Sequence, residues 1–498
     1  MAVSILSSAV GRQQGHLEKV RPAGVAGTFY PADPSALVAE MDALLLNASL
    51  PKIDGQIVAA VAPHAAFPYS GPVAAFTYAA LKGFSFARVV VIAPSHYEAF
   101  DFTSVYDGDG YATPLGTIVV DTAFARELTK QSHSIQLSDR GHRATRQGSE
   151  HALEVQLPWL QRLLGNFDLV PIVMGSQSYE SSRALGVALA NCVDKKNTSK
   201  QVSGGTLIVA SSDLSHYHDC AEAEKIDHRT LSALKARDYL SMSRNFEMRV
   251  WEACGGAPIV AAMIAAEHLG ANHAQVLRYA NTADVTGDPS HVVGYSADIF
   301  VKSQSQSSTD PPFSLNEGEK EKLLALARQS VEHIVREGKL VDVVETGDEV
   351  LDQEHGAFVT LRQEGNLRGC VGYTSAAKPL YETVRDTAAL AAVRDPRFLP
   401  VKPEDLPRLE YEISVLSPLV HVSDIHEVEV GRHGLLIKNC HREGLLLPQV
   451  PVEQHWDRTR FLQETCRKSG LPEDSWMDSD TDIFRFTALV FNEFAKSG

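Results

Sequence analysis

The sequence predicts an α/β domain with a mostly parallel sheet and helices on both faces, followed by a smaller α+β domain. Four short apolar runs, at 57–64, 87–96, 167–175 and 206–216, alternate with stretches of helical periodicity. Short runs rich in Val and Ile are typical of strands buried on both faces, and their alternation with helices is typical of a parallel sheet. After residue 314 a long amphipathic helix precedes strands that follow one another directly, which indicates an α+β arrangement.

Shifts in composition divide the chain into four segments. Residues 1–20 carry little pattern and are expected to form a mobile tail, and residues 21–302 hold the first domain. The stretch 303–314 is polar, rich in Ser and ends near Pro-Pro, so we expect a linker there and the second domain at 315–498. Near the start of the first domain, Asp33 is expected to cap an amphipathic helix.

Overall charge and composition exclude several classes of protein. The formal net charge of -16 over 498 residues repels phosphate backbones, so we expect no nucleic-acid partner. No apolar run approaches the ~20 residues of a membrane span, and no Lys or Arg precedes the short apolar stretch at the start, so we expect no signal peptide. The six cysteines form no C-x-x-C pair and are expected to be free thiols. We therefore expect a cytoplasmic protein that does not bind a membrane.

Polar side chains gather at the ends of three predicted strands. His64 and His96 end the first and second strands, and Asp213 and His216 follow the fourth. In open α/β sheets, ligands bind beyond the carboxyl ends of the strands, so these side chains are expected to meet at one edge. Imidazole is a common ligand of zinc, iron and copper. One such His is more often structural, but three at equivalent places indicate a metal site.

Cys254 is one candidate for an anionic ligand of that metal. It stands in a Gly-rich turn, ACGGAP, that opens an apolar helix. A thiolate at a helix N-terminus is stabilised by the helix dipole and by free backbone amides. Free cysteines are more often small buried apolar residues, so the pattern alone leaves both interpretations open.

The first domain resembles the Memo family over roughly residues 20–302. The motifs that carry the resemblance, in matching order and spacing, are GTFYP, PHAAFPYSG, APSHY, SEHALEVQLP, SSDLSHY, ACGGAP and VGYSA. The resemblance implies a fold like that of the class III extradiol dioxygenases, which use nonheme iron. It also implies a metal held by the His of PHAAFPYSG, the His of APSHY and the Cys of ACGGAP, which are His64, His96 and Cys254.

The same resemblance implies that Asp213 and His216 form the acid/base group beside the metal. We expect the Asp213 carboxylate to orient the His216 ring, which would move the proton. This chain departs from the dioxygenases in one respect, because a thiolate stands where they have a carboxylate. A softer ligand favours copper or zinc more than a carboxylate does. We therefore expect a divalent metal, with iron or copper favoured and zinc as the alternative.

Several further residues are candidates for the surroundings of the metal. Glu150 and His151 are expected to open a helix, where a carboxylate is often only a complement to the helix dipole. His142 lies in a Gly- and Arg-rich stretch that is expected to be a solvated loop. The candidate substrate-binding or supporting residues are Tyr69, Ser70, Glu150, His151 and His291.

The second domain resembles the AMMECR family over nearly its whole length. The motif Leu367-Arg368-Gly369-Cys370-Val371-Gly372 carries the resemblance, together with GAFVTL, RDPRF, YEISVL and GLLLPQ. Because Arg368 stands two residues before Cys370, a lowered thiol pKa and a reactive or binding role are one interpretation. A buried Cys in a tight hairpin is the other. Arg394 and Glu412 are candidate partners in the same cleft.

The two resemblances together suggest a function and a partner. Proteins resembling these halves occur in prokaryotes with a radical S-adenosylmethionine enzyme, in the AmmeMemoRadiSam system, so such an enzyme is an implied partner. We expect a metal-dependent, dioxygenase-like oxidoreductase that acts on a small organic substrate. The alternatives are an iron- or copper-binding buffer or scaffold without catalysis, and a zinc-dependent hydrolase or transferase. The sequence contains no G-x-G-x-x-G, Walker P-loop, H-E-x-x-H or G-x-S-x-G motif.

Overall fold

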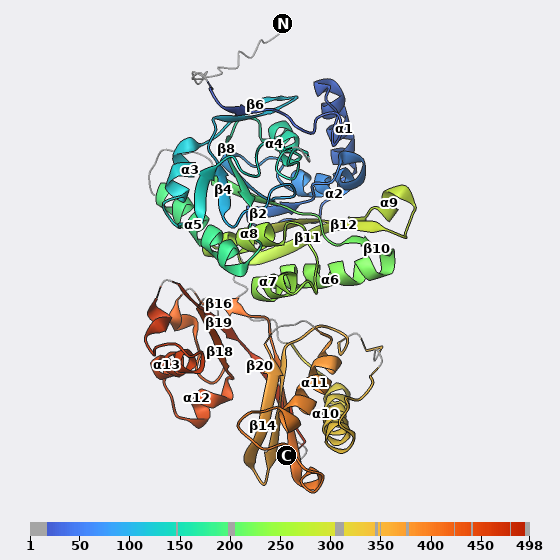
Figure 1. Ribbon diagram of the computed structural model, residues 1–498, viewed down its shortest axis with the longest axis vertical. Helices are drawn as coiled ribbons and strands as arrows, with labels where there is room; N and C mark the ends of the chain where they lie inside the picture. Colours follow the sequence, from blue (N-terminus) through green and yellow to red (C-terminus); the bar gives the residue numbers. More distant parts are fainter. Residues whose placement is uncertain are drawn as a thin grey trace. The chain divides into compact units, whose positions relative to one another are not determined.

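The computed structural model divides into two compact units (Figure 1). One comprises Met1–Glu224 and Glu252–Lys302, and the other comprises Lys225–Trp251 and Ser303–Gly498. Most of the expected tail and linker lies outside the described residues. Among the described residues, no helix is both long and apolar enough to cross a membrane. The structure describes residues 17–145, 148–197, 205–303, 313–343, 347–348, 350–374, 378–422, 424–439, 442–478 and 480–493.

The four predicted strands form the centre of the main sheet in the N-terminal unit. They pair in the order β2-β9-β3-β8, and all three ladders between them are parallel. Nearly every residue of the four strands is buried, as expected for strands covered on both faces. The predicted parallel core is therefore confirmed. The bounds are β2 (Gln56–Ala62), β9 (Gly205–Ser211), β3 (Phe86–Pro94) and β8 (Asp168–Met174).

Antiparallel ladders join this parallel core to the strands beside it, so the sheet as a whole is mixed. β12 runs antiparallel to β2 and also pairs with β10 and β11, while β4 runs antiparallel to β8 and parallel to β7. A separate small sheet has the order β1-β5-β6. These strands are β12 (Val292–Lys302), β10 (His216–His218), β11 (His273–Asn281), β4 (Thr103–Tyr106), β7 (Ile135–Ser138), β1 (Val20–Arg21), β5 (Gly110–Thr113) and β6 (Gly116–Val119).

Helices cover both faces of the main sheet, as predicted. α2 packs on β2, β11 and β12 and is itself contacted by α1 and α4, whereas α8 packs on β2, β3 and β9 and contacts α5 (Figure 1). Asp33 caps α1 as expected, because its side chain accepts a hydrogen bond from the Ala36 amide at 2.8 Å. The helices are α1 (Pro34–Asn47), α2 (Phe67–Ala80), α3 (Thr122–Leu128), α4 (Gln156–Leu164), α5 (Tyr179–Asn197), α8 (Gly256–His268) and α9 (Ala283–Thr286).

A buried ion pair fixes the segment that leads into α4. Arg21 and Glu154 are paired, and both side chains are almost fully buried. Glu154 also accepts hydrogen bonds from the backbone amides of Gly24 and Val25 and from the Tyr30 hydroxyl, so its charge is fully compensated. Arg21 donates to the Glu150 carbonyl at 2.6 Å.

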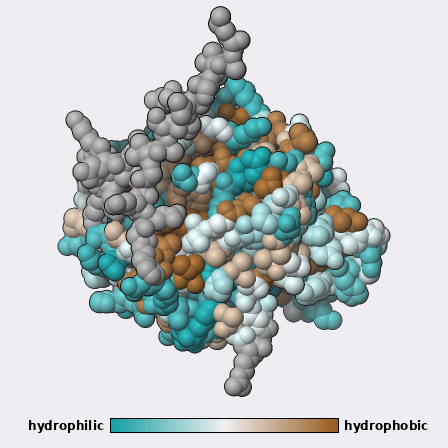
Figure 2. Space-filling view, turned by 90° about the horizontal axis from the view of Figure 1, so that it is seen from above, coloured by the Kyte–Doolittle hydropathy of each residue, from teal (hydrophilic) through white to brown (hydrophobic). Residues whose placement is uncertain are grey.

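The surface seen in Figure 2 shows hydrophobic residues in patches among hydrophilic ones.

The C-terminal unit has the α+β arrangement that the sequence predicts. Two antiparallel four-stranded sheets have the orders β14-β13-β15-β20 and β16-β19-β17-β18. The β13–β14 hairpin turns at Glu364 and Gly365, both at positive φ, as a two-residue hairpin requires. The strands are β13 (Ala357–Gln363), β14 (Asn366–Tyr373), β15 (Leu409–Leu416), β16 (Val420–His421), β17 (Gly434–Asn439), β18 (Arg442–Leu446), β19 (Thr481–Phe486) and β20 (Ala488–Asn492).

α10 and α11 cover one face of the first of these sheets, and α13 packs on the second. Asn316 and Glu319 form a capping box at the start of α10, which favours the long helix there. The helices of this unit are α10 (Glu317–Glu337), α11 (Leu380–Val393), α12 (Gln449–Glu453) and α13 (Arg458–Lys468), with α7 (Tyr239–Glu247) and most of α6 (Cys220–Ala236).

The packing of α11 on β14 depends on the glycine of the LRGC motif. A Cβ atom at Gly369 would lie 2.2 Å from the Ala391 carbonyl oxygen, which is backbone and cannot turn aside. The helix can approach the strand this closely only because residue 369 has no side chain. The glycine of this motif therefore has a packing role that is separate from any role of Cys370.

We predict that Gly369→Ala lowers the free energy of unfolding of the C-terminal unit by about 2 kcal/mol or more, because the helix must move off the strand. Urea denaturation followed by circular dichroism measures the change. Gly318→Ala in α10 of the same unit is the matched control, since a Cβ atom there would meet only the Asn316 side chain, at 3.3 Å. Equal stability of the two variants would contradict the prediction.

Candidate metal centre

The ends of the parallel strands bring the predicted residues to one edge of the sheet. His64 lies two residues beyond β2, His96 two residues beyond β3, and Asp213 two residues beyond β9. The Asp213 carboxylate accepts a hydrogen bond from the His64 backbone amide at 2.7 Å, which ties two of these strand ends together. The predicted meeting of side chains at this edge is therefore observed.

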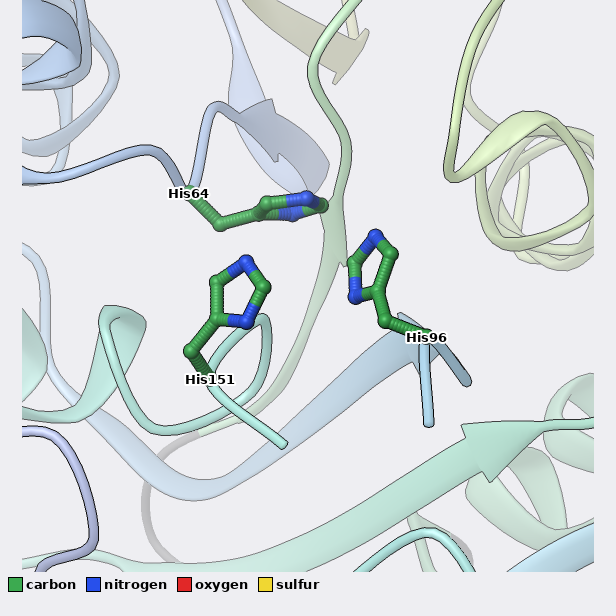
Figure 3. A group of neighbouring side chains, drawn as sticks. All are labelled: His64, His96 and His151. Atoms are coloured by element: carbon green, nitrogen blue, oxygen red, sulfur yellow. The ribbon is translucent and has the colours of Figure 1, made fainter. Parts of the chain in front are cut away.

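Three imidazole rings lie around a common space at this edge. His64, His96 and His151 point toward one another from three separate segments (Figure 3). Their ring centroids are 5.2 Å apart for His64 and His96, 4.7 Å for His96 and His151, and 5.4 Å for His64 and His151. Each ring offers one nitrogen, and the three nitrogens lie within 4.8 Å of one another, as ligands of one metal ion would.

Glu150 orients the His96 ring. Its two carboxylate oxygens accept from the His96 Nδ1 at 2.9 Å and from the His96 backbone amide at 2.6 Å. Burial alone would raise the pKa of Glu150, but the hydrogen bonds and charge of His96 lower it to about 2. Burial likewise opposes the charged form of His96, yet the hydrogen bond to Glu150 raises its pKa. With Nδ1 donating to the carboxylate, Nε2 is the nitrogen left to bind a metal.

The helical placement predicted for Glu150 and His151 is wrong, because α4 begins at Gln156 and the residues before it form turns. This turn lets the Glu150 side chain reach back to the amides of His151 and Ala152, at 2.9 and 3.0 Å. Glu150 therefore acts as a support for His96 and not as a complement to a helix dipole.

His151 has a ring nitrogen without a hydrogen bond, although the Glu150 carboxylate lies 3.7 Å away. Its Nδ1 atom is buried and makes no hydrogen bond within the described structure. Burial and the neighbouring His64 lower the pKa of His151 to about 4, so the ring is neutral at physiological pH. A buried neutral imidazole with an unpaired nitrogen has the state that a metal ligand needs.

Ser211, which the sequence did not single out, fixes the tautomer of His64. The Ser211 hydroxyl donates its proton to the Ala152 carbonyl at 2.6 Å, so it can only accept from the His64 Nδ1, which lies 2.9 Å away. Gln156 completes this arrangement by donating to the same hydroxyl at 2.8 Å. His64 is 1% exposed, and its burial, followed by the proximity of His96, lowers its pKa well below the usual range.

Cys254 approaches His64 from the other side. Its Sγ lies 3.1 Å from the His64 Nε2, and the Asp213 amide donates to it at 3.2 Å. His64, Asp213 and Cys254 make a second group of ligand atoms within 4.8 Å of one another. The trio of His64, His96 and Cys254 does not meet that distance limit among the described residues. Cys254 as the third metal ligand stays a prediction.

The helix N-terminus and the backbone amides do not stabilise a Cys254 thiolate as expected. Cys254 precedes α8, as predicted, but burial and then the negative charge of Asp213 raise the pKa of its thiol. Hydrogen bonds from backbone amides act in the opposite direction and are outweighed. A thiolate at this position therefore needs a cation beside it.

His216 is held differently from the expectation. Its Nδ1 lies 2.8 Å from the Leu214 carbonyl, so a backbone oxygen orients the ring in place of the Asp213 carboxylate. The Nδ1 proton points to that carbonyl, and Nε2 is left as an acceptor. Asp213 instead supports His64 through its backbone, and burial raises the pKa of Asp213.

Three of the four candidates of the C-terminal unit, Arg368, Cys370 and Glu412, lie on its first sheet. Thr360 of β13 is in register with Cys370 of β14 on one side and with Glu412 of β15 on the other. The Thr360 hydroxyl donates to the Cys370 sulfur at 3.3 Å. Of the two interpretations of Cys370, the lowered thiol pKa is not found, because burial raises its pKa more than Thr360 and Arg397 lower it. Arg368 reaches the Leu399 carbonyl at 2.7 Å.

Arg394 and Glu412 are on opposite faces of this sheet. Arg394 ends α11, which packs on the face of β14 that carries Gly369. Residues alternate between faces along a strand, so Cys370 and its neighbour Glu412 lie on the face away from α11. Arg394 is therefore not a partner of Glu412 in one cleft, as the sequence had suggested.

Comparison with known proteins identifies the family of the N-terminal unit. Residues 21–299 match the family described as Memo-like protein. The chain belongs to the Memo family. It is 33% identical over 283 residues to a MEMO1 family protein of Methanothermobacter thermautotrophicus, a match that covers 55% of this chain and 98% of that protein. A MEMO1 family protein of Methanopyrus kandleri is 32% identical over 289 residues, covering 56% of this chain and 98% of that protein.

The Memo-family part is joined to a second family. Residues 324–491 match the AMMECR1 family. A protein of Thermococcus gammatolerans is 44% identical over 181 residues, 34% of this chain and 88% of that protein. The crystal structure of uncharacterized protein PH0010 from Pyrococcus horikoshii is 40% identical, with a TM-score of 0.36, and covers 36% of this chain and 95% of that chain. The two family matches confirm the predicted pairing of domains.

The remaining candidates of the Memo-family unit have more local contacts. Ser70 is buried and donates to the Ala65 carbonyl at 2.7 Å, which supports the loop that carries His64. Tyr69 is 45% exposed, and His291 is exposed with its Nδ1 3.2 Å from the Ser290 hydroxyl. His142 is 1% exposed and bonded to Tyr111, so the solvated loop expected there is wrong.

We predict that Asp395→Asn destabilises the C-terminal unit, because Asp395 accepts from the Cys370 amide at 2.8 Å and pairs with Arg397. The hydrogen bond from Arg397 lowers the pKa of Asp395 to about 2. A depressed carboxyl pKa stabilises the fold above the unfolded-state value near 4 and ceases to do so as the pH falls toward 2. Solvent screens part of the pair, so we expect a loss of about 1 kcal/mol at pH 7.

Urea denaturation between pH 7 and pH 2 measures this difference. The gap between wild type and Asp395→Asn should close as the pH falls below about 4. Glu404→Gln is the control, because that carboxylate is largely exposed and makes only a distant ion pair. A gap that stays constant down to pH 2 would show that the carboxylate charge contributes nothing.

Proposed function

We propose that the Memo-family unit is a metal-dependent oxidoreductase, related in fold to the extradiol dioxygenases, that acts on a small organic substrate. The observation that supports this most is the group of His64, His96 and His151, whose ligand nitrogens lie within 4.8 Å of one another. Two His with a third ligand is a recurring set for a redox metal that keeps open positions. Iron or copper is the favoured ion, and zinc is the alternative.

The hydrogen bonding of the three histidines also fits a metal site, and this support does not depend on the family resemblance. The buried Nδ1 of His151 makes no hydrogen bond within the described residues, its nearest charged neighbour being a Glu150 carboxylate oxygen at 3.7 Å, and buried nitrogens without a hydrogen bond are rare unless something binds them. Ser211 and Glu150 occupy the Nδ1 atoms of His64 and His96, which is the outer support that metal-binding histidines have. His151 completes a ligand group with His64 and His96, whereas Cys254 completes one with His64 and Asp213. His151 is therefore the third ligand that the distances support, and Cys254 is the one that the family resemblance implies.

The chain's own side chains have separable tasks in this proposal. His64 and His96 hold the ion, and a bound iron or copper would supply a Lewis acid and a redox partner. His216 accepts or returns a proton at Nε2, because its Nδ1 is engaged by Leu214. Asp213 holds the His64 backbone in place. A radical S-adenosylmethionine enzyme as partner stays a prediction.

We predict that the full chain binds one equivalent of iron or copper, and that His64→Ala and His96→Ala abolish binding. Elemental analysis of protein purified without chelator, and titration of the metal-free protein, measure this. Glu150→Gln should weaken binding by about 10- to 100-fold, because His96 keeps its ring but loses the carboxylate that orients it. Comparison of the metal affinity of His151→Gln and Cys254→Ser identifies the third ligand, because affinity falls only in the variant whose substituted residue binds the metal.

His291→Gln is the matched control for these variants, because His291 is exposed and belongs to neither ligand group. Metal binding that is unchanged in His64→Ala, or lost equally in His291→Gln, would overturn the site. Stoichiometric zinc in place of iron or copper would favour hydrolysis or group transfer.

The redox part of the proposal has its own test. We predict that metal-loaded protein consumes oxygen or an electron acceptor when supplied with a library of small organic compounds, and that His216→Gln lowers kcat by about 100-fold or more without loss of metal. Oxygen electrode traces with metal analysis of the same samples measure both. Tight metal binding without turnover of any redox substrate would contradict the oxidoreductase proposal and favour a metal-binding buffer without catalysis.

A further inference from the structure

The C-terminal unit contains a cavity that none of the contacts described above uses. Its volume is about 460 Å³, within the range of pockets that hold small ligands. It lies where the end of α10, the second half of α11 and the end of β14 come together. This is the helix-covered side of the sheet, away from Cys370 and Glu412. The cavity is therefore a separate site from both clusters of candidate residues.

The walls of the cavity are mostly apolar. Ile334 of α10, Leu390 and Val393 of α11, and Leu340 line it. Leu340 is 45% exposed, which is unusual for a leucine beside a cavity and leaves apolar surface for a ligand to cover. A Cβ atom at Gly338 would have no neighbour within 4 Å among the described residues, so the chain is not tightly packed at this point of the lining.

One end of the cavity carries an uncompensated positive charge. Arg394 lines the cavity and is exposed, and its guanidinium makes no hydrogen bond or ion pair within the described part of the chain. The carboxylate of Asp386 also lines the cavity, but its two oxygens already accept from Lys378 at 2.6 Å and from Arg385 at 2.7 Å. A ligand that enters therefore meets the free charge of Arg394 and not that of Asp386.

We propose that this cavity binds a small organic carboxylate with an apolar body, whose carboxylate pairs with Arg394 while its apolar part lies against Ile334 and Leu390. A guanidinium matches a carboxylate through two parallel hydrogen bonds. Inorganic anions would use Arg394 alone and leave the apolar walls uncovered. Uncharged apolar molecules would use only the walls. The combination of both features selects an amphiphilic monoanion.

The positive charge of Arg394 is opposite in sign to the net charge of the chain. The chain has a net charge of -16, which repels anions in general, so an anion site needs a local cation that no carboxylate neutralises. Arg394 also lies at the C-terminus of α11, where a cation complements the helix dipole. Arg336 lies in the last turn of α10, so it also complements a helix dipole, but it does not line the cavity. Comparison of the two arginines separates ligand binding from the dipole effect.

Isothermal titration calorimetry of the full chain with octanoate tests the proposal, with 1-octanol and acetate as partial ligands. We expect octanoate to bind, 1-octanol to bind about tenfold more weakly, and acetate to give no measurable binding. Arg394→Gln should weaken octanoate binding by about tenfold and leave 1-octanol unchanged. Arg336→Gln should change neither, and Val393→Phe should weaken octanoate binding by filling the cavity.

Several outcomes would overturn the proposal. Octanoate that does not bind the wild-type chain, or that binds no better than 1-octanol, would remove the role of the charge. Equal losses in Arg394→Gln and Arg336→Gln would show that only the overall charge or the helix dipole matters. The melting temperature of each variant checks the fold, and Arg394 is exposed, so its substitution should leave that temperature unchanged. The metal centre is not involved in any of these measurements.

Discussion

The parallel register of β2, β9 and β3 is the constraint on which the candidate metal centre depends. Ala62 pairs with Ser211, and Ala210 pairs with Ile92, so the three strands end at nearly the same level. Their following residues must then leave the sheet at one edge, where the chain is free of ladder hydrogen bonds. Side chains separated by more than a hundred residues in sequence become neighbours for this reason alone.

Burial determines the chemistry of the side chains at that edge. It keeps His64 and His151 neutral, and it keeps the Cys254 sulfur protonated while no cation is near. Glu150 and His96 are the exceptions, because the hydrogen bond between them, together with backbone amides in the case of Glu150, outweighs their desolvation. The site therefore holds two neutral imidazoles, His64 and His151, and a third ring, His96, that a carboxylate orients. This donor set is suited to a divalent ion.

The C-terminal unit separates its candidate groups by the two faces of one sheet. Alternation along β14 sends Cys370 to one face and Gly369 to the other, and the lack of a side chain at Gly369 allows α11 to pack there. Cys370, Thr360 and Glu412 lie together away from the helices, whereas Arg394 faces a cavity on the helix side. The AMMECR-type motif thus combines a packing requirement with a polar cluster in adjacent residues.

Local patterns in the sequence determined the strands, most helices and the strand ends that carry His64, His96 and Asp213. These are periodicity and chain-order effects, and they need no knowledge of distant contacts. Only the tertiary structure decided which partners hold those residues. Glu150 lies in a turn before α4, where periodicity predicted helix. Ser211, on the neighbouring strand, fixes the tautomer of His64. The Leu214 carbonyl, and not the Asp213 carboxylate, orients the His216 ring. The states of Cys254 and Cys370 depended on burial, which no spacing in the sequence records, because desolvation is set by everything that packs around a thiol.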